Sequence, residues 1–404
     1  MSGLAGIGTY LPGWENSGRR VVGADEDALT MAVAAGRALL TGLRADSGRG
    51  VDDVTRVVLV SRDLPLLEGG NSAALLAGLG LSDQLPVVEQ VGGGPAVLDL
   101  VATSLPGTLV LAADLEPAGG GAALISPDGT LGAAVDVLGR VTRSLPVTSR
   151  GRDGVRWEYD DPRLMLERGT KTAIDGLGLA EKPDVIAGLA PKPTRLLGRG
   201  GARALPTTGA SSAMFALAEA GPGDVVVATE QATAVGATIA RAVPTFRDEV
   251  ATLPVPRTRT TQGPDIGISL PAYERAFEAK LRWEAGSCDV CGHLAMPPRL
   301  RCTACGSEDG WSLTPLPRTG EVYTKVDIHV PVPGRATPYS LAIVQLDGTD
   351  VRVLVSVTGA PSGTVEIGDR GRLVLRLVDT RSGVPDYGHA LRPEVADQTR
   401  GEST

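Results

Sequence analysis

The four cysteines of this 404-residue chain lie in one stretch, CDVCGHLAMPPRLRCTAC, as two C-x2-C pairs separated by ten residues. A C-x2-C turn places two thiolates on one side of a metal ion, and two such turns complete the tetrahedron of a structural zinc site. Four cysteine ligands leave no position for water, so this metal would stabilise a fold and take no part in a reaction. We expect structural Zn2+ bound by Cys288, Cys291, Cys302 and Cys305.

Two other interpretations of this stretch stay open. His293 follows Cys291 after one residue and could replace a ligand, although four cysteines already fill the coordination shell. A redox role for a C-x2-C pair is the other alternative. A disulfide would need an oxidising compartment, and the N-terminus carries no charged segment followed by an apolar run that would direct export.

The composition limits the partners. The formal net charge is −8 and no block of lysine or arginine occurs, so we expect no nucleic-acid partner. No apolar run approaches the roughly 20 residues that span a bilayer, so we expect no membrane segment and a cytoplasmic location. The length allows two or three domains.

The N-terminal part alternates between strand and helix patterns, which is typical of a layered α/β domain. We expect strands at 3–12, 57–60, 87–91, 109–113 and 119–126 and helices at 25–43, 72–79 and 95–102.

The chain also repeats itself. Pro-Gly followed by TLVLAAD (108–114) is echoed by Pro-Gly followed by DVVVATE (224–230). The first helix and the strand at 52–60 are echoed by a helical stretch at 162–177 and a strand at 183–189. A repeat this long predicts two similar half-domains. Chance similarity between βα units is the alternative.

The C-terminal part begins after a stretch rich in proline and threonine, which predicts a linker. The following helix places Tyr273, Phe277 and Leu281 on one face, which could pack on the zinc module or bind a partner or an acyl chain. Strand patterns at 320–330, 339–347, 350–359 and 369–379 predict a small antiparallel barrel of the OB type. The predicted units are 1–245 (α/β), 246–270 (linker), 271–312 (helix and ribbon), 313–392 (barrel) and 393–404 (disordered tail).

Several motifs carry a family resemblance. PPRLRC, Trp311, GEVY, PYSLAIVQLD and IGDRGRLVL, spread over 270–380, resemble the zinc-ribbon plus OB-fold proteins that associate with thiolases and handle acyl-CoA. The resemblance implies a rubredoxin-like zinc ribbon and an OB barrel. GIGTYLP, EDALTMAVAAGRALL, VLAADLEP and TTGASSAMFALAEAGPGDVVV are similar to the thiolase superfamily, most closely to 3-hydroxy-3-methylglutaryl-CoA synthase and ketoacyl synthase III types. That likeness implies a duplicated α/β/α/β/α sandwich.

The family's chemistry uses a cysteine at a helix N-terminus, a histidine and an asparagine. By resemblance, the cysteine's place falls within Gly92–Gly94, the histidine's on Leu189 and the asparagine's near Thr207. The chain has no cysteine before Cys288 and no histidine before His293, so a cysteine–histidine acyl-transfer mechanism cannot be assembled in this domain. We therefore predict no catalytic residue.

Hydroxyl and basic side chains offer weaker candidates. A hydroxyl near the second helix start could form a covalent intermediate, but capping is the usual role of such residues; the candidates are Thr207, Thr208, Ser211 and Ser212. Three basic residues could bind CoA phosphates or simply be solvated; they are Lys192, Arg195 and Arg199. The loop with Arg62 and Asp63 lies where the synthases place an acid, but the match is too loose to assign a role.

The leading hypothesis is a non-catalytic subunit of a thiolase-type complex that performs Claisen condensation, retro-cleavage or C-acyl transfer on acyl-CoA. Its expected partner is a separate catalytic chain that carries the cysteine, in a hetero-oligomer, with acyl-CoA as a possible ligand. The alternative is an acyl-CoA-dependent acyltransferase or condensing enzyme with a non-cysteine mechanism. A free-standing CoA-binding protein is the third class.

Overall fold

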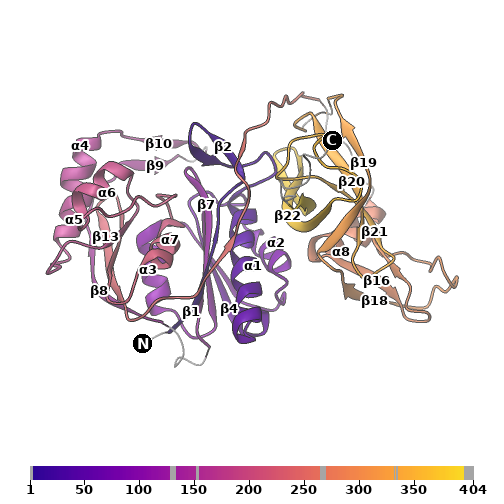
Figure 1. Cartoon of the computed structure of the whole chain (residues 1–404), viewed down its shortest axis with the longest axis horizontal. Coiled ribbons are helices and arrows are strands. Elements are labelled where there is room, and N and C mark those ends of the chain that lie inside the picture. The colour runs from indigo at the N-terminus through magenta and orange to yellow at the C-terminus, as the bar shows by residue number, and fades with distance from the viewer. Residues whose placement is uncertain are drawn as a thin grey trace, which may run out of the picture.

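The computed structural model describes residues 3–127, 133–151, 154–263, 270–331, 333 and 335–394. An α/β domain forms one side of the molecule, and the ribbon that carries the cysteines and a β-barrel form the other (Figure 1). The predicted fold class is confirmed: a layered α/β domain is followed by a ribbon that carries the cysteines and by an OB-type barrel.

One ten-stranded sheet runs through the α/β domain in the order β11-β12-β13-β8-β1-β7-β6-β4-β5, with β14 paired to β1. Its strands are β1 (Gly3–Tyr10), β4 (Arg56–Val60), β5 (Val87–Gln90), β6 (Thr108–Leu115), β7 (Ala118–Ile125), β8 (Ala133–Thr142), β11 (Val185–Ala187), β12 (Val225–Glu230), β13 (Thr233–Ile239) and β14 (Thr245–Asp248).

The two halves of this sheet have the same topology. In the first half β4 is parallel to β6, and β7 and β1 follow antiparallel. In the second half β11 is parallel to β12, and β13 and β8 follow antiparallel. The strands β6 and β12, which carry the repeated sequence, occupy equivalent places. The predicted duplication is therefore confirmed by the strand order.

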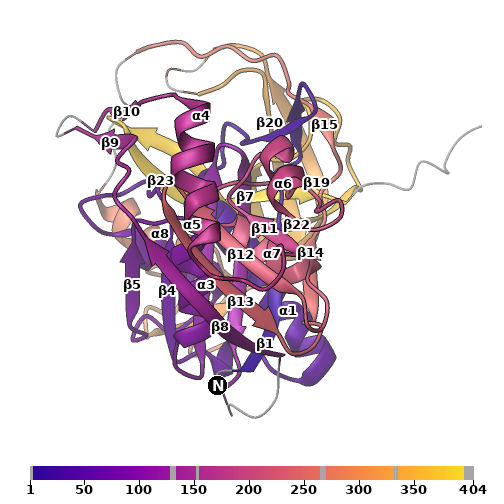
Figure 2. The same ribbon diagram turned by 90° about the vertical axis from the view of Figure 1, so that its left-hand side faces the viewer.

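Helices form three layers around the two halves (Figures 1 and 2). Side chains of β6 alternate, so that Leu109 and Leu111 pack against the outer helices, whereas Val110 and Ala112 pack against the central pair. The outer helices are α1 (Ala28–Ser47) and α2 (Asn71–Leu79); the central helices are α3 (Gly94–Thr103) and α7 (Ser212–Glu219); and the opposite face carries α4 (Pro162–Leu164), a π-helical turn (Met165–Thr170), α5 (Lys171–Asp175) and α6 (Pro191–Leu197).

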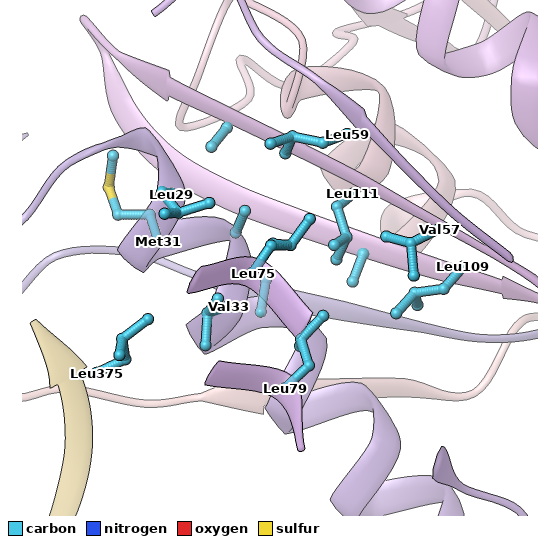
Figure 3. Packing of buried hydrophobic residues seen from close by; sticks show 14 of the residues in the cluster. Leu29, Met31, Val33, Val57, Leu59, Leu75, Leu79, Leu109, Leu111 and Leu375 are labelled. Atoms are coloured by element: carbon cyan, nitrogen blue, oxygen red, sulfur yellow. The ribbon is translucent and has the colours of Figure 1, made fainter. Parts of the chain in front are cut away.

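The outer apolar cluster joins α1 and α2 to the sheet (Figure 3). Leu29, Met31 and Val33 of α1 and Leu75 and Leu79 of α2 belong to the same cluster as inward-facing side chains of β4 and β6. Leu375, from the barrel, joins the same cluster. The α/β domain and the barrel therefore share a hydrophobic core.

Helix α1 is longer than its sequence predicts. Asp27 caps its N-terminus through a capping box with Thr30, as its acidic start leads one to expect. The prediction ends it near Gly42, but the helix continues to Ser47 and ends at Gly48, whose φ is +71°. Gly42 serves packing instead, because a Cβ there would lie 2.1 Å from the Phe246 ring.

The predicted linker contains regular structure. β14 pairs with β1, and β15 (Leu253–Pro254) pairs in parallel with β2 (Trp14–Asn16), which forms a hairpin with β3 (Arg19–Val21). The composition of the linker does not indicate β14 and β15, because they pair with β1 and β2, which lie near the N-terminus of the chain. Part of the linker, 264–269, lies outside the described residues. The minor elements are η1 (Val51–Asp53), β9 (Thr148–Arg150) and β10 (Arg156–Glu158).

The helix α8 (Leu270–Arg282) packs inward. Leu281 is buried in the cluster shared with α1 and α2, and α8 also contacts the barrel strand β23. The predicted contact of Tyr273 lies outside the side chains that the structure describes. The three-stranded ribbon sheet follows, with β16 (Glu284–Cys288), β17 (Leu294–Ala295) and β18 (Trp311–Pro315).

The barrel has five strands in the order β21-β20-β19-β22-β23. A parallel bridge between Val357 and Leu391 brings its two ends together. The strands are β19 (Thr319–Ile328), β20 (Tyr339–Leu346), β21 (Arg352–Ser356), β22 (Arg370–Arg381) and β23 (Val384–Pro393). The strand β23 was not predicted, because its Pro385, Asp386 and Gly388 are poor strand formers. From 395 the predicted disordered tail lies outside the described residues.

Within the ranges given above, none of the helices is both long and apolar enough to cross a membrane.

Candidate functional site

The four cysteine sulfurs gather at one end of the ribbon. All lie within 4.8 Å of one another, with 3.8 Å between Cys288 and Cys305 and 3.6 Å between Cys291 and Cys302. A tetrahedral ion with metal–sulfur bonds of about 2.3 Å requires sulfur–sulfur distances of roughly 3.8 Å. The spacing of the thiols therefore fits one metal ion.

Two equivalent turns position these thiols. The N–H of Gly292 donates to the Cys288 carbonyl at 2.8 Å, and the N–H of Gly306 donates to the Cys302 carbonyl at 3.0 Å. Both glycines have positive φ, +73° and +77°, which a glycine adopts without strain. The C-x-x-C-G sequence thus folds twice into the same turn.

His293 lies beside the cysteines without completing their set. Its Nε2 is 3.1 Å from the Thr303 hydroxyl, and its backbone carbonyl accepts from the Cys288 N–H at 3.0 Å. The cluster that fits a metal consists of the four predicted cysteines alone among the described residues.

A second set of residues surrounds the N-terminus of α3, where the resemblance places the nucleophile. A Cβ at Gly93 would lie 2.6 Å from Glu230 Oε2, so the carboxylate of β12 occupies the space of a side chain there. Arg62 forms an ion pair with Glu230. Burial lowers the pKa of Arg62, as does the nearby Arg156, whereas Asp114 and Asp63 act against this shift. An ion pair therefore fills the mouth of the helix.

The predicted hydroxyl candidates lie at the start of α7. Asp114 of β6 accepts from the N–H groups of Ala210 and Ser211, each at 2.7 Å, and from the Ser211 hydroxyl at 2.5 Å. Burial raises the pKa of Asp114, although these hydrogen bonds oppose the shift. Thr207, Ser211 and Ser212 are completely buried, so none presents a hydroxyl to an incoming substrate.

These contacts revise the predicted capping. The hydroxyl of Ser211 does not cap its own helix; the carboxylate of Asp114 caps it from a distant strand. The contact between Asp114 and Ser211 cannot be predicted from local sequence, because the two residues are 97 positions apart.

The predicted basic residues do not gather into one site. Arg199 pairs with Glu181 at 2.8 Å and with Asp184 at 3.5 Å. Lys192 and Arg195 are exposed on α6. Leu189, at the family histidine's place, packs against the apolar cluster under α5.

Comparisons with known proteins match parts of the chain. Residues 313–376 match the family of the ChsH2 C-terminal OB-fold domain. Benzoylsuccinyl-CoA thiolase subunit BbsA of Thauera aromatica is 29% identical over 140 residues, which is 34% of this chain and 95% of that protein. A probable enoyl-CoA hydratase alpha subunit of Thermomonospora curvata is 29% identical over 236 residues, which is 51% of this chain and 72% of that protein.

Solved structures give weaker likenesses. An Ltp2–ChsH2(DUF35) aldolase chain is 28% identical with a TM-score of 0.26, covering 30% of this chain and 93% of that one. OleA of Xanthomonas campestris is 16% identical with a TM-score of 0.47, covering 59% and 98%.

The barrel strands from β19 into β22 therefore lie in the segment that is similar to the ChsH2 OB-fold domain. The chain joins it, through a ribbon with a four-cysteine cluster, to a duplicated α/β sandwich, which is the fused arrangement of domains that the sequence predicts.

Proposed function

We propose that this chain is a non-catalytic subunit of an acyl-CoA-processing complex of the thiolase type. The observation that carries the proposal is the Arg62–Glu230 pair at the mouth of α3, where the family's chemistry needs a thiolate. A relative named as a thiolase subunit and the ChsH2-type OB domain support the same class of complex.

The chemistry explains why a partner is needed. Claisen condensation, retro-cleavage and C-acyl transfer require a nucleophile whose pKa the helix N-terminus lowers. In this chain the Arg62–Glu230 ion pair occupies that position, and no cysteine precedes Cys288. The catalytic cysteine and histidine would then belong to a separate thiolase-type chain, and acyl-CoA would be bound by the complex.

The strand β5 offers a surface for that chain. It ends the ten-stranded sheet and pairs only with β4 in the described part of the molecule. Val88 and Val91, beside this edge, are 36% and 65% exposed. An open edge with exposed apolar residues can be extended by a strand of a partner. We place the catalytic subunit there.

Affinity purification of the tagged chain from its own cells, followed by intact-complex mass measurement, tests the proposal. We expect a stoichiometric thiolase-type partner that carries a cysteine and a histidine, and acyl-CoA turnover only when both chains are mixed. Turnover by the pure chain alone would contradict the non-catalytic assignment. A homo-oligomer without any such partner would contradict the complex.

A pair of variants tests the docking edge. Val88→Lys puts a charge on the edge of β5 and should weaken the complex by about tenfold or more. Leu354→Lys is the matched control, because Leu354 is a 67% exposed apolar residue on the barrel. If Leu354→Lys separates the subunits while Val88→Lys does not, the barrel is the docking surface.

We further propose that the cysteine cluster binds Zn2+ with a structural role, in a reducing cytoplasm. Metal analysis of the purified chain should give one zinc per chain. Cys302→Ser should abolish zinc binding and lower the melting temperature, whereas Ser307→Ala, in the same turn, should retain the metal. Full stability after complete removal of the metal would contradict the structural role.

A further inference from the structure

A cavity of about 740 Å3 lies between parts of helix α1 and the barrel strand β22. One face of α1 forms one wall, β14 contributes the adjoining residues, and β22 and β23 form the opposite wall. Figure 1 shows α1 and β22 next to each other, and the two elements are in contact. This volume lies within the roughly 300–1,000 Å3 of small-molecule sites.

The charge of the cavity lining is strongly positive. Six arginines and two acidic residues line it, in a chain whose formal net charge is −8. The arginines are Arg37, Arg247, Arg318, Arg372, Arg376 and Arg392, and the acids are Asp248 and Glu249.

The described counter-charges do not balance this excess. Arg376 is neutralised by Glu26 at 3.0 Å. Arg372 and Arg392 share a single oxygen of Asp248, at 3.1 and 2.5 Å. One carboxylate therefore serves two guanidinium groups. Of the two, Arg392 is buried, where a charge without full compensation is costly.

Arg392 carries a donor without a partner. Its side chain is 7% exposed, and its Nη1 makes no hydrogen bond among the residues that the structure describes. Buried polar groups are almost always hydrogen-bonded, so this nitrogen leaves the positive charge of Arg392 incompletely compensated. An anion bound among the arginines of the cavity would offset that charge.

Among the described residues, Arg37 and Arg318 form their hydrogen bonds with neutral acceptors. Arg37 donates to the Gly78 carbonyl at 2.7 Å, and Arg318 donates to His389 and to the Arg282 carbonyl, all neutral acceptors. Burial, together with the charge of Arg37, lowers the pKa of Arg318 to about 9, so Arg318 remains cationic at neutral pH.

We propose that this cavity binds a small phosphate-bearing anion, held by Arg37 and Arg318 from one side and by Arg372 and Arg392 from the other. Guanidinium groups suit phosphate because their planar donors bond two oxygens at once. Several such groups from different elements fit a ligand with more than one phosphate. The site does not depend on the catalytic partner proposed above.

Calorimetric titration of the full-length chain, loaded with zinc, tests the site with inorganic phosphate, pyrophosphate and 3′,5′-ADP. We expect saturable binding of pyrophosphate that is tighter than that of phosphate and weakens with added salt. Tighter binding of 3′,5′-ADP than of pyrophosphate would identify a nucleotide ligand, and equal binding would identify the phosphates alone. Either supports the proposal.

Arg392→Leu should weaken pyrophosphate binding by about tenfold or more, because it removes a hydrogen bond between charged groups. Arg37→Met, on the opposite wall, should have a similar effect and keeps the test valid if the first variant fails to fold. Arg140→Leu, an exposed arginine paired with Asp99, should leave binding unchanged. No saturable binding of any of the three probes, or unchanged binding by both cavity variants, would overturn the proposal.

Discussion

At the scale of single residues, His389 is a buried imidazole between cations. Its Nδ1 is 3.1 Å from the Lys280 carbonyl oxygen, its Nε2 contacts Arg318, and its ring lies 4.7 Å from that of Trp283. Burial, assisted by the positive charge of Arg318, places the pKa of His389 well below its ordinary value of 6.5. The folded protein therefore holds this histidine neutral at pH values where an unfolded chain protonates it.

We predict a loss of stability as the pH falls below about 6.5, because protons then bind the unfolded chain more strongly than the folded one. The free energy of unfolding should decrease by up to about 1.4 kcal/mol per pH unit from His389. His389→Gln should flatten this dependence in urea unfolding between pH 7 and pH 5. His329→Gln, at an exposed histidine, should leave the slope unchanged; an equal loss of slope in both variants would refute the assignment.

At the scale of elements, helix α1 links the two parts of the molecule. One of its faces packs on the sheet, and another lines the arginine-rich cavity. Gly42 lies on the face toward β14, where the Phe246 ring occupies the space of a side chain. Helix propensity and packing therefore make opposite demands at this position.

Gly42→Ala should destabilise the protein, although alanine favours a helix interior by about 1 kcal/mol over glycine. The added methyl group would overlap the Phe246 ring, and such overpacking typically costs about 1–3 kcal/mol. Urea unfolding measures the sign of the change. Combining Gly42→Ala with Phe246→Leu should recover part of the loss, and a stabilised single variant would show that the ring moves away freely.

At the scale of the whole molecule, the barrel and the α/β domain share buried contacts. Leu375 of β22 is 2% exposed within the cluster of α1 and α2. The Tyr387 hydroxyl donates to Asp27 at 2.5 Å, and the N–H of Leu377 donates to the Asp25 carbonyl at 2.9 Å. These contacts tie the cap of α1 to the barrel, so the two parts should unfold together.

Calorimetry of the metal-loaded chain should show one cooperative transition. Leu375→Ala should lower the free energy of unfolding by about 2–5 kcal/mol, because it leaves a cavity in the shared core. Leu354→Ala, at an exposed position on the same barrel, should have little effect. Two separate transitions in the unmodified chain would contradict a shared core.

The sequence by itself determined the features that short spacing controls. The two C-x2-C pairs predicted the cysteine cluster, because each turn is fixed by five consecutive residues. The alternation of strands and helices and the repeated Pro-Gly strands predicted the duplicated α/β sandwich. The lack of any cysteine before Cys288 excluded the family's usual nucleophile from this domain.

Only the tertiary structure showed which side chains lie at the positions where the related synthases have catalytic residues, and which charged residues come together elsewhere. Glu230 lies against Gly93, Asp114 caps a helix 97 residues away in the chain, and arginines from four elements meet in one cavity. Each contact joins residues that are distant in sequence, and a lone arginine or glutamate carries no local sign of its partner. Local sequence patterns predicted most helices and strands of this protein, whereas tertiary packing determined which charged side chains become neighbours.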